Sequence, residues 1–508
     1  MEKSGTIEVV VEVEPVEGHL DPTSEVTLDI IKKRAVRGVA ILTGRTFLLS
    51  ALSLIATGFL TVFLSPSEFG IFWIVSAIVN FLAYFSDVGL AAALIQKKDS
   101  VTEEELRTTF TIQQFLVLSL LLFLFVISPY LEHYYSLSEE GKFLLYALGL
   151  SLFLSSLKTI PSVLLERGLD FPKLVIPQVL ENLIYNVIAV FLAWRGYGVT
   201  SFTYAVIARG LVGLLAIYLI KPWIPGIAFD KKALKKLLTF GVPYQANTLL
   251  ATIKDDGMTA FLGGILGAAG IGLLGWAQKW AYTPLRLFMD HVLKVTFPAF
   301  SRMQDEEKHL AAAVTRSIFF VCLLVFPATA GLLILAPILV DIIPRYEKWE
   351  PALIPLLFIS INTFFAAATT QLTNLLNAIG KIKITFKLML MWTTLTWIFI
   401  PFLALNFGIN GAAFGYALVG TSSLIAMIIA HKIVRFSFAE SVIRPFLGTL
   451  GMSVVLLLIR AVLPSRIYSV WILIASGGLF YLTIMYFIVG PSILIDAKKG
   501  IKAIFSRS

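Results

Sequence analysis

The chain has 508 residues, of which 57% are hydrophobic and 14% are charged, and its mean hydropathy is +0.85. A soluble protein of this size carries about a quarter charged residues, so the composition excludes a soluble globular protein and favours a polytopic membrane protein. The net charge of +9 does not indicate a nucleic-acid ligand, because most of the cations are distributed over the short segments between apolar stretches. The single cysteine, Cys322, excludes a disulfide framework.

The N-terminal residues 1–31 carry eight acidic residues against one basic residue, Lys3. They lack the basic and then apolar pattern of a signal peptide. This composition predicts a disordered acidic tail in the cytoplasm. The alternation of apolar and acidic residues over 7–13 would also suit a strand formed against a partner.

Apolar stretches of membrane-spanning length fill the chain from residue 39 to residue 490. A bilayer core of about 30 Å takes about 20 residues of helix. The sequence therefore predicts an all-α membrane protein with about 14 transmembrane helices. We place them at 39–63, 69–95, 109–128, 143–165, 173–194, 200–220, 238–262, 270–293, 314–336, 352–379, 385–405, 409–430, 441–463 and 468–490.

The distribution of Lys and Arg predicts how these helices are oriented. With the N-terminus inside, the cytoplasmic segments hold 28 of the cations, and the segments on the opposite face hold five. Cytoplasmic loops carry an excess of Lys and Arg, so both termini of this multi-pass protein are expected in the cytoplasm. The expected location is the cytoplasmic (inner) membrane.

Two halves of the chain resemble each other at nearly fixed offsets. The sequence that begins at Leu64 is similar to the one at Leu266, 202 residues later, and the one at Leu164 is similar to the one at Leu376, 212 residues later. Such an offset contains an even number of spans, so the repeats are parallel, and parallel repeats bind their substrate between two lobes. The expected parts are an acidic tail at 1–36, six-helix lobes at 37–220 and 237–434, a cytoplasmic linker at 221–236, helices 13 and 14 at 435–490, and a basic cytoplasmic tail at 491–508.

The repeat includes three motifs: Leu64–Phe72 (LSPSEFGIF), Phe85–Gln96 (FSDVGLAAALIQ) and Leu164–Lys173 (LLERGLDFPK). In these motifs the chain resembles the oligosaccharide flippases of polysaccharide biosynthesis, in the branch of the colanic-acid and teichuronic-acid exporters. That family belongs to a superfamily that also holds the lipid II flippase and multidrug antiporters. The resemblance covers about residues 32–490 and does not extend to the acidic tail.

The resemblance implies two pseudo-symmetric six-helix lobes that form a V-shaped central cleft and open alternately to each side of the membrane. It implies a polyprenyl-diphosphate-linked oligosaccharide as the cargo, moved to the outer leaflet for surface polysaccharide biosynthesis. Expected partners are this lipid-linked oligosaccharide, the lipid bilayer, and the polysaccharide polymerase and glycosyltransferases that act on the same material.

Several cations fall inside the apolar stretches, where a charge costs about 2.5 to 3.5 kcal/mol at a helix centre. Arg and Lys suit the phosphate oxygens of a diphosphate, so these residues are candidates for a cationic cleft. The alternative is an ion pair that only holds helices together, because intramembrane acids are available as partners. The candidates are Arg45, Lys158, Arg209, Lys254, Lys279 and Arg286.

Acidic residues in the spans are candidates for ion coupling or charge balance. In the run Lys254-Asp255-Asp256, one carboxylate would neutralise the lysine, and the other would be free to bind Na⁺ or a proton. No other cofactor is expected. The set comprises Asp255, Asp256, Glu181 and Asp87, of which Asp87 would also suit an exposed helix end.

Two polar stripes of amides are candidates for hydrogen bonds with sugar hydroxyls. They are equally suited to bind neighbouring helices to one another. The residues are Asn182, Asn186, Gln371 and Asn374.

Signatures of catalysis are missing from the sequence. It contains no GxxxxGK[ST] run for ATP, no HExxH pattern and no Cys/His cluster for a metal, so neither an enzyme nor a metal site is expected. A membrane saccharide polymerase would need larger outer loops. A small-molecule or drug antiporter on the same scaffold would need an apolar or acidic cleft, and it stays as the alternative function.

Overall fold

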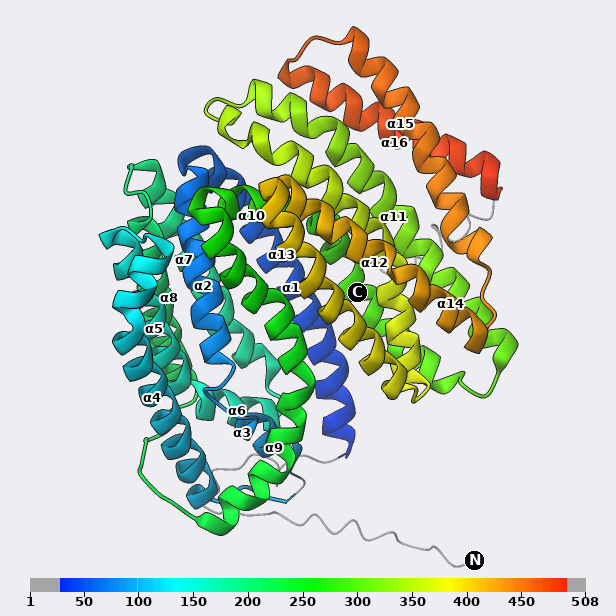
Figure 1. Cartoon of the computed structure of the whole chain (residues 1–508). Helices are drawn as coiled ribbons and strands as arrows, with labels where there is room; N and C mark the ends of the chain where they lie inside the picture. The colour runs from blue at the N-terminus through cyan, green and yellow to red at the C-terminus, as the bar shows by residue number, and fades with distance from the viewer. Residues whose placement is uncertain (1–27, 98, 491–508) are drawn as a thin grey trace, which may run out of the picture.

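The structure, a computed structural model, describes residues 28–490 apart from Lys98. The predicted basic tail at 491–508 and residues 1–27 of the predicted acidic tail lie outside the described residues. The described chain is helical and holds no strand (Figure 1). Its helices are α1 (Leu28–Phe63), α2 (Pro66–Ala83), α3 (Leu90–Gln96), α4 (Glu103–Tyr135), α5 (Glu139–Leu157), α6 (Thr159–Arg167), α7 (Phe171–Trp194), α8 (Thr200–Ile220), α9 (Lys231–Thr252), η2 (Ile253–Gly257), α10 (Met258–Arg302), α11 (Glu307–Ile342), η3 (Glu347–Ala352), α12 (Leu353–Ala378), α13 (Ile382–Thr421), α14 (Ser423–Ile433), η4 (Ala439–Ile443), α15 (Arg444–Val462) and α16 (Ile467–Val489).

Twelve continuous helical stretches in the described part are long and apolar enough to cross a membrane. This confirms the all-α membrane fold, although the sequence predicts about fourteen spans. Two of the twelve, Leu249–Met289 with 41 residues and Ile382–Ile433 with 52, are far longer than one crossing needs. Each of them contains a glycine at which the chain reverses its direction.

The first reversal lies at Gly267, inside α10. Its φ of 67° and ψ of 178° are not helical and are conformations that glycine adopts without strain. Gly263, before it, lies against Ile74 of α2, and Gly275, after it, lies against the neighbouring Trp73. The two arms therefore run in opposite directions along α2.

The second reversal lies at Gly408, inside α13, with a φ of 60°. Here Gly411 contacts Leu403 and Gly415 contacts Ile400, as expected for two arms that fold back on each other. Gly196, in the turn between α7 and α8, also has a positive φ and lies 212 residues before Gly408. The turn at Ser65 lies 202 residues before Gly267, so these turns recur at the two offsets of the sequence repeat.

Local signals explain where α2 and α4 begin. Ser65 and Glu68 form a capping box, in which the Ser65 hydroxyl accepts from the Glu68 N–H and the Glu68 carboxylate accepts from the Ser65 N–H at 2.6 Å. Thr102 and Glu105 cap α4 in the same way. The Leu64–Phe72 motif thus has a structural role in starting α2.

Two predicted spans are interrupted in the structure. The span predicted at 69–95 divides into α2 and α3, because Val88 and Gly89 have φ values of 50° and 75° and the Asp87 carboxylate caps α3 at Ala91. The span predicted at 143–165 divides at Lys158 into α5 and α6.

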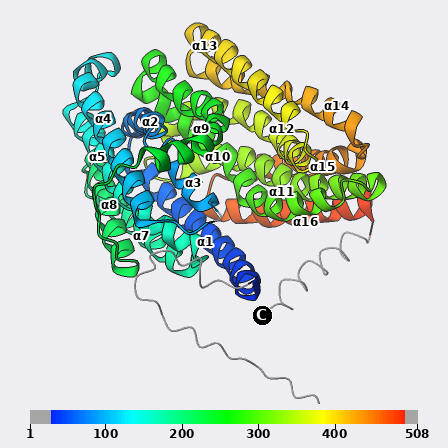
Figure 2. The same cartoon turned by 90° about the horizontal axis from the view of Figure 1, so that it is seen from below.

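The helices form two groups, which we call the first lobe (α1–α8) and the second lobe (α9–α14). In Figure 2, α4, α5, α7 and α8 lie on one side and α11–α14 on the other, with α2, α9 and α10 between them. The two lobes meet mainly where α2 packs along η2 and both arms of α10, and where α3 packs on α9. Helices α15 and α16 pack on each other and on α11 at the edge of the molecule.

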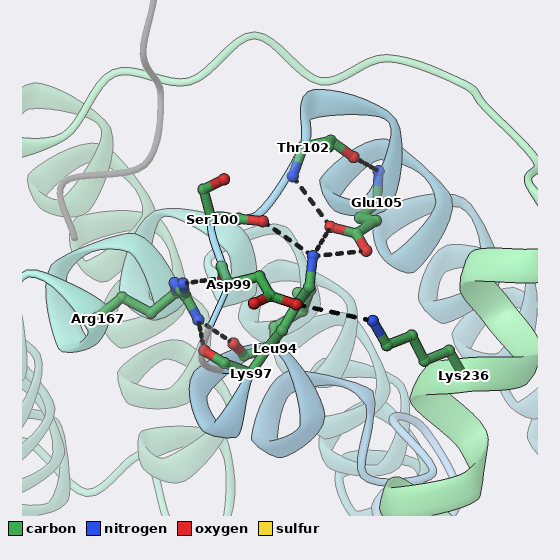
Figure 3. A network of polar contacts seen from close by, with 8 residues as sticks. All are labelled: Leu94, Lys97, Asp99, Ser100, Thr102, Glu105, Arg167 and Lys236. Carbon is green, nitrogen blue, oxygen red and sulfur yellow. Dashed lines mark hydrogen bonds and ion pairs between the residues drawn. The ribbon is translucent and has the colours of Figure 1, made fainter. Parts of the chain in front are cut away.

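A polar network joins the ends of α3, α6 and α9 (Figure 3), at the end of the molecule where α1 begins (Figure 1). Arg167 donates to the carbonyl oxygens of Leu94, Lys97 and Asp99, at 2.5, 2.8 and 3.0 Å. Asp99 lies 4.0 Å from Lys236 of α9. The arginine of the Leu164–Lys173 motif therefore fixes the loop before α4, and that loop contacts the second lobe.

Candidate functional site

A cavity of about 470 Å³ lies between α1 of the first lobe and α10 of the second. Arg45 lines it from α1, and Lys279 and Arg286 line it from α10, where a spacing of seven residues places both on one helix face. Neither Lys279 nor Arg286 forms an ion pair with any carboxylate that the structure describes. Arg45 hydrogen-bonds Gln178 of α7, and its Nε has no partner among the described residues. This cavity is therefore strongly cationic.

A second cavity, of about 520 Å³, lies within the second lobe between η2, α10, α12, α13 and α14. It shares Gln278, Tyr282 and Arg286 with the first cavity, so Arg286 lies at the junction of the two. Lys254 and Asp255 also line the second cavity and form an ion pair with each other. We call these two the cationic cavity and the second-lobe cavity.

The other two candidate cations, Lys158 and Arg209, lie in the first lobe and line neither of these cavities. The Lys158 Nζ lies 2.6 Å from one oxygen of Glu181, and the Arg209 Nε lies 3.8 Å from the other. Arg209 also lies over the ring of Tyr185, 6.0 Å from its centroid. These residues form an ion-paired cluster beside a cavity of about 310 Å³ that Lys158, Glu166 and Glu181 line.

The candidate acids have different surroundings. Asp256 accepts a hydrogen bond from Asn80 of α2, and Asp255 is exposed in the second-lobe cavity. Asp87 accepts the Ala91 N–H at 3.2 Å, and burial raises the pKa of its carboxyl above the ordinary value of 3.8. Burial also raises the pKa of Glu166.

The candidate amides lie at contacts between helices. Asn182 donates to Ser53 of α1, and Asn186 donates to Asn182 within α7. Gln371 is buried and accepts from Thr296 of α10, and Asn374 donates to the same hydroxyl at 2.9 Å. None of the four lines the cationic cavity or the second-lobe cavity.

Different polar residues, which the sequence analysis did not single out, line the second-lobe cavity. They are hydroxyl and amide side chains from α10, α12, α13 and α14. Trp392 also lines the cavity; the sequence offers its ring for stacking on a sugar, but only as a weak signal, because aromatic residues gather at the interfaces of any membrane protein. For the hydroxyl side chains, the only signal in the sequence is the spacing of Thr369, Thr370 and Thr373, which places them near one another on α12. Threonine is so common in membrane helices that this signal is weak.

The end of the molecule opposite the Arg167 network is closed by contacts between the lobes. The Trp349 Nε1–H of η3 donates to the Thr61 carbonyl at 2.7 Å, and the Lys348 amine donates to the Val62 carbonyl at 2.8 Å. The hydroxyls of Tyr346 and Thr61 lie 2.9 Å apart. These three contacts, which we call the η3 clamp, hold the end of α1 against the second lobe.

The chain is similar to known proteins over most of its length. A family model described as polysaccharide biosynthesis protein matches residues 59–354. An uncharacterized membrane protein in the cps region of Klebsiella pneumoniae is 26% identical over 484 residues, which are 89% of this chain and 95% of that protein. The teichuronic acid biosynthesis protein TuaB of Bacillus subtilis is 24% identical over 73% of this chain and 77% of its own length.

Among solved structures, the inward closed conformation of the lipid II flippase MurJ matches with a TM-score of 0.73. The match covers 89% of this chain and 99% of that one at 18% sequence identity. At that identity the likeness shows the fold, which is the two-lobe fold predicted from the sequence.

Proposed function

The chain belongs to the polysaccharide biosynthesis protein family, and on that premise we propose that it flips a polyprenyl-diphosphate-linked oligosaccharide from the cytoplasmic to the outer leaflet of the cytoplasmic membrane. The family and its relatives are of the transporter type, and the fold is that of the flippase superfamily. The cargo and the direction of movement are the parts that we propose.

The observation that carries the proposal is the cationic cavity. A diphosphate is anionic and loses its hydration when it enters the membrane, so a cavity with three cations lowers the cost of its passage. Lys279 and Arg286 have no described carboxylate partner, and an anionic ligand would supply the missing charge. Arg also offers a planar fork that matches phosphate oxygens.

The position of the cavity supports transport by alternating access. It lies between the lobes, and the η3 clamp closes the end of the molecule opposite the Arg167 network. Release on that side would require the three clamp contacts to open. Our proposal is that the lobes exchange this closed state with one in which the clamp is open.

The test is a proteoliposome assay with a polyprenyl-diphosphate-linked saccharide. Arg286→Ala should lower the flipping rate at least about tenfold, since a charge-assisted hydrogen bond contributes about 1.5 to 3 kcal/mol. Arg286→Lys should restore part of the rate, because the charge returns without the bidentate fork.

Arg195→Ala is the matched control, because Arg195 is exposed at the end of α7, where it stacks on Phe191 and Trp194, and it does not line the cationic cavity. It should flip the lipid at the normal rate. Normal flipping by a variant in which Arg45, Lys279 and Arg286 are all neutral would overturn the cationic-cavity mechanism. Transport of a cationic drug with no effect on the lipid would instead support the antiporter alternative.

A further inference from the structure

We propose that the second-lobe cavity is the subsite for the saccharide, and that it selects an uncharged sugar attached next to the diphosphate. This inference rests on the proposed function, because it assigns the saccharide of the same cargo. The two proposed binding sites lie in different cavities: the diphosphate would bind between the lobes, and the sugar would bind inside the second lobe.

The cationic cavity and the second-lobe cavity are adjacent and share part of their lining. Gln278, Tyr282 and Arg286 occupy successive turns of α10 and line both cavities. A diphosphate held at Arg286 therefore has its next covalent neighbour, the first sugar, at the mouth of the second-lobe cavity. A volume of about 520 Å³ lies within the range typical of small-molecule sites.

The lining of the second-lobe cavity offers hydrogen-bonding groups that suit a sugar. Sugar hydroxyls both donate and accept, and so can the hydroxyls of Thr370 and Thr396 that line this cavity. The Thr373 hydroxyl donates to the Thr370 carbonyl at 2.9 Å and can still accept. Asn362 donates its amide N–H to the Tyr416 carbonyl at 2.8 Å, which leaves its own carbonyl oxygen as an acceptor. By contrast, the amides of Gln371 and Asn374 are used in contacts between helices.

Trp392 adds an aromatic surface to the second-lobe cavity. Its ring lines the cavity, and its Nε1–H is buried without a hydrogen-bond partner among the described residues. A buried indole N–H usually finds a partner, because leaving it unpaired costs free energy. The N–H is covered by protein in this structure, so a sugar hydroxyl would accept it only after a small side-chain movement, whereas the apolar face of the sugar would pack on the ring directly.

The charges in the cavity indicate which sugar fits. Lys254 and Asp255 neutralise each other, and Arg286 faces the diphosphate at the junction. The remaining lining is neutral, so an acidic sugar would have no free cation within this cavity. An uncharged hexose or N-acetylhexosamine meets the arrangement best.

The experiment compares binding of four lipids to the full-length protein in nanodiscs. The probes are a polyprenyl diphosphate without sugar and the same lipid carrying glucose, galactose or N-acetylglucosamine. At least one sugar-bearing lipid should bind about tenfold more tightly than the sugar-free lipid, as expected for two or three added hydrogen bonds.

Three conservative variants then locate the sugar. Thr370→Val and Thr373→Val keep the volume and remove the hydroxyl, and Trp392→Phe keeps an aromatic ring but removes the N–H together with part of the indole. Each should weaken binding of the preferred sugar-bearing lipid about threefold to tenfold and leave the sugar-free lipid unchanged. Thr394→Val is the matched control, because Thr394 is exposed on α13 and does not line the cavity.

The outcomes separate the subsite from the proposed function. If the sugar-free lipid binds and none of the three sugars adds affinity, or if none of the three variants reduces that added affinity, the subsite is refuted and the flippase proposal stands. If the protein binds none of the four lipids, the proposed function fails and the subsite falls with it.

Discussion

Glu181 shows how one carboxylate changes the role of two cations. Its two oxygens contact Lys158 and Arg209, and the side chains of Lys158 and Glu181 are only 14% and 12% exposed. Within the apolar interior of the first lobe, each partner lowers the cost of burying the other. This pairing is what a structural role of the two cations predicts, whereas Lys279 and Arg286 have no such partner among the described residues.

Glu181→Gln should destabilise the protein by about 3 kcal/mol, because it leaves Lys158 buried without its counter-charge. A double variant that also carries Lys158→Met should recover much of this loss. Thermal unfolding in detergent measures both effects, with Glu140→Gln, an exposed residue at the start of α5, as the control. Equal stability of the single variant and the parent would contradict the structural role.

Asp87 gives the protein a stability that depends on pH. Burial raises the pKa of Asp87 above its ordinary value of 3.8, so the folded chain holds the proton more tightly than the unfolded chain. Stability from this group is therefore greatest at low pH and falls as the pH rises through the folded pKa.

Asp87→Asn keeps a good capping residue and removes the charge. It should raise the melting temperature at pH 8, and the gain should shrink as the pH falls toward 4.5. A gain that is the same at both pH values would show that the Asp87 charge is not responsible.

Glycine residues lie where the two long helices, α10 and α13, reverse their direction. At Gly267 an added Cβ would meet no atom within 4 Å, so any cost of a substitution comes from its φ of 67° alone. Gly331, inside α11, is equally free of neighbours but has ordinary helical geometry. The two positions form a matched pair.

Gly267→Ala should lower stability by about 1 to 3 kcal/mol, the usual cost of a residue held in a rare backbone conformation. Gly331→Ala should be neutral or stabilise by about 0.5 to 1 kcal/mol, because alanine favours a helix. The melting temperatures of the two variants provide the comparison. Similar shifts in both would mean that the reversal at Gly267 does not need glycine.

The apolar helices could largely be predicted from the sequence, because apolar length is a local property. The two-lobe fold also followed from motifs such as Leu64–Phe72, whose Ser65 and Glu68 cap α2. The site could be predicted only in part. Which cations are neutralised depends on contacts such as Lys158 with Glu181, 23 residues apart on different helices. Threonines such as Thr370 can be recognised as candidate binding residues only once the structure shows that they line a cavity.

The orientation of the protein in the membrane can be tested directly by cysteine labelling. Cysteines introduced at Ser136 and Glu347 should react with a membrane-impermeant maleimide added outside intact cells, and cysteines at Ser100 and Lys232 should react only after permeabilisation. All four residues are exposed in the structure, and the native Cys322 is buried and gives little background. The excess of Lys and Arg on one face is the physical reason for this orientation. The opposite labelling pattern would reverse the proposed direction of transport.

The packing of α2 has a consequence for how the lobes can move. Both arms of the Gly267 reversal lie on α2 so closely that a Cβ atom at Gly70 or Gly275 would overlap its neighbours, and one at Gly263 would be tightly crowded. Helix α1, in contrast, faces α10 across a cavity and is joined to the second lobe mainly through the clamp at its end. If the lobes rotate relative to each other, the closely packed interface along α2 should therefore move least, and α1 should separate from the second lobe most. The widest swing, and the entrance for a bulky lipid-borne cargo, should lie on the α1 side.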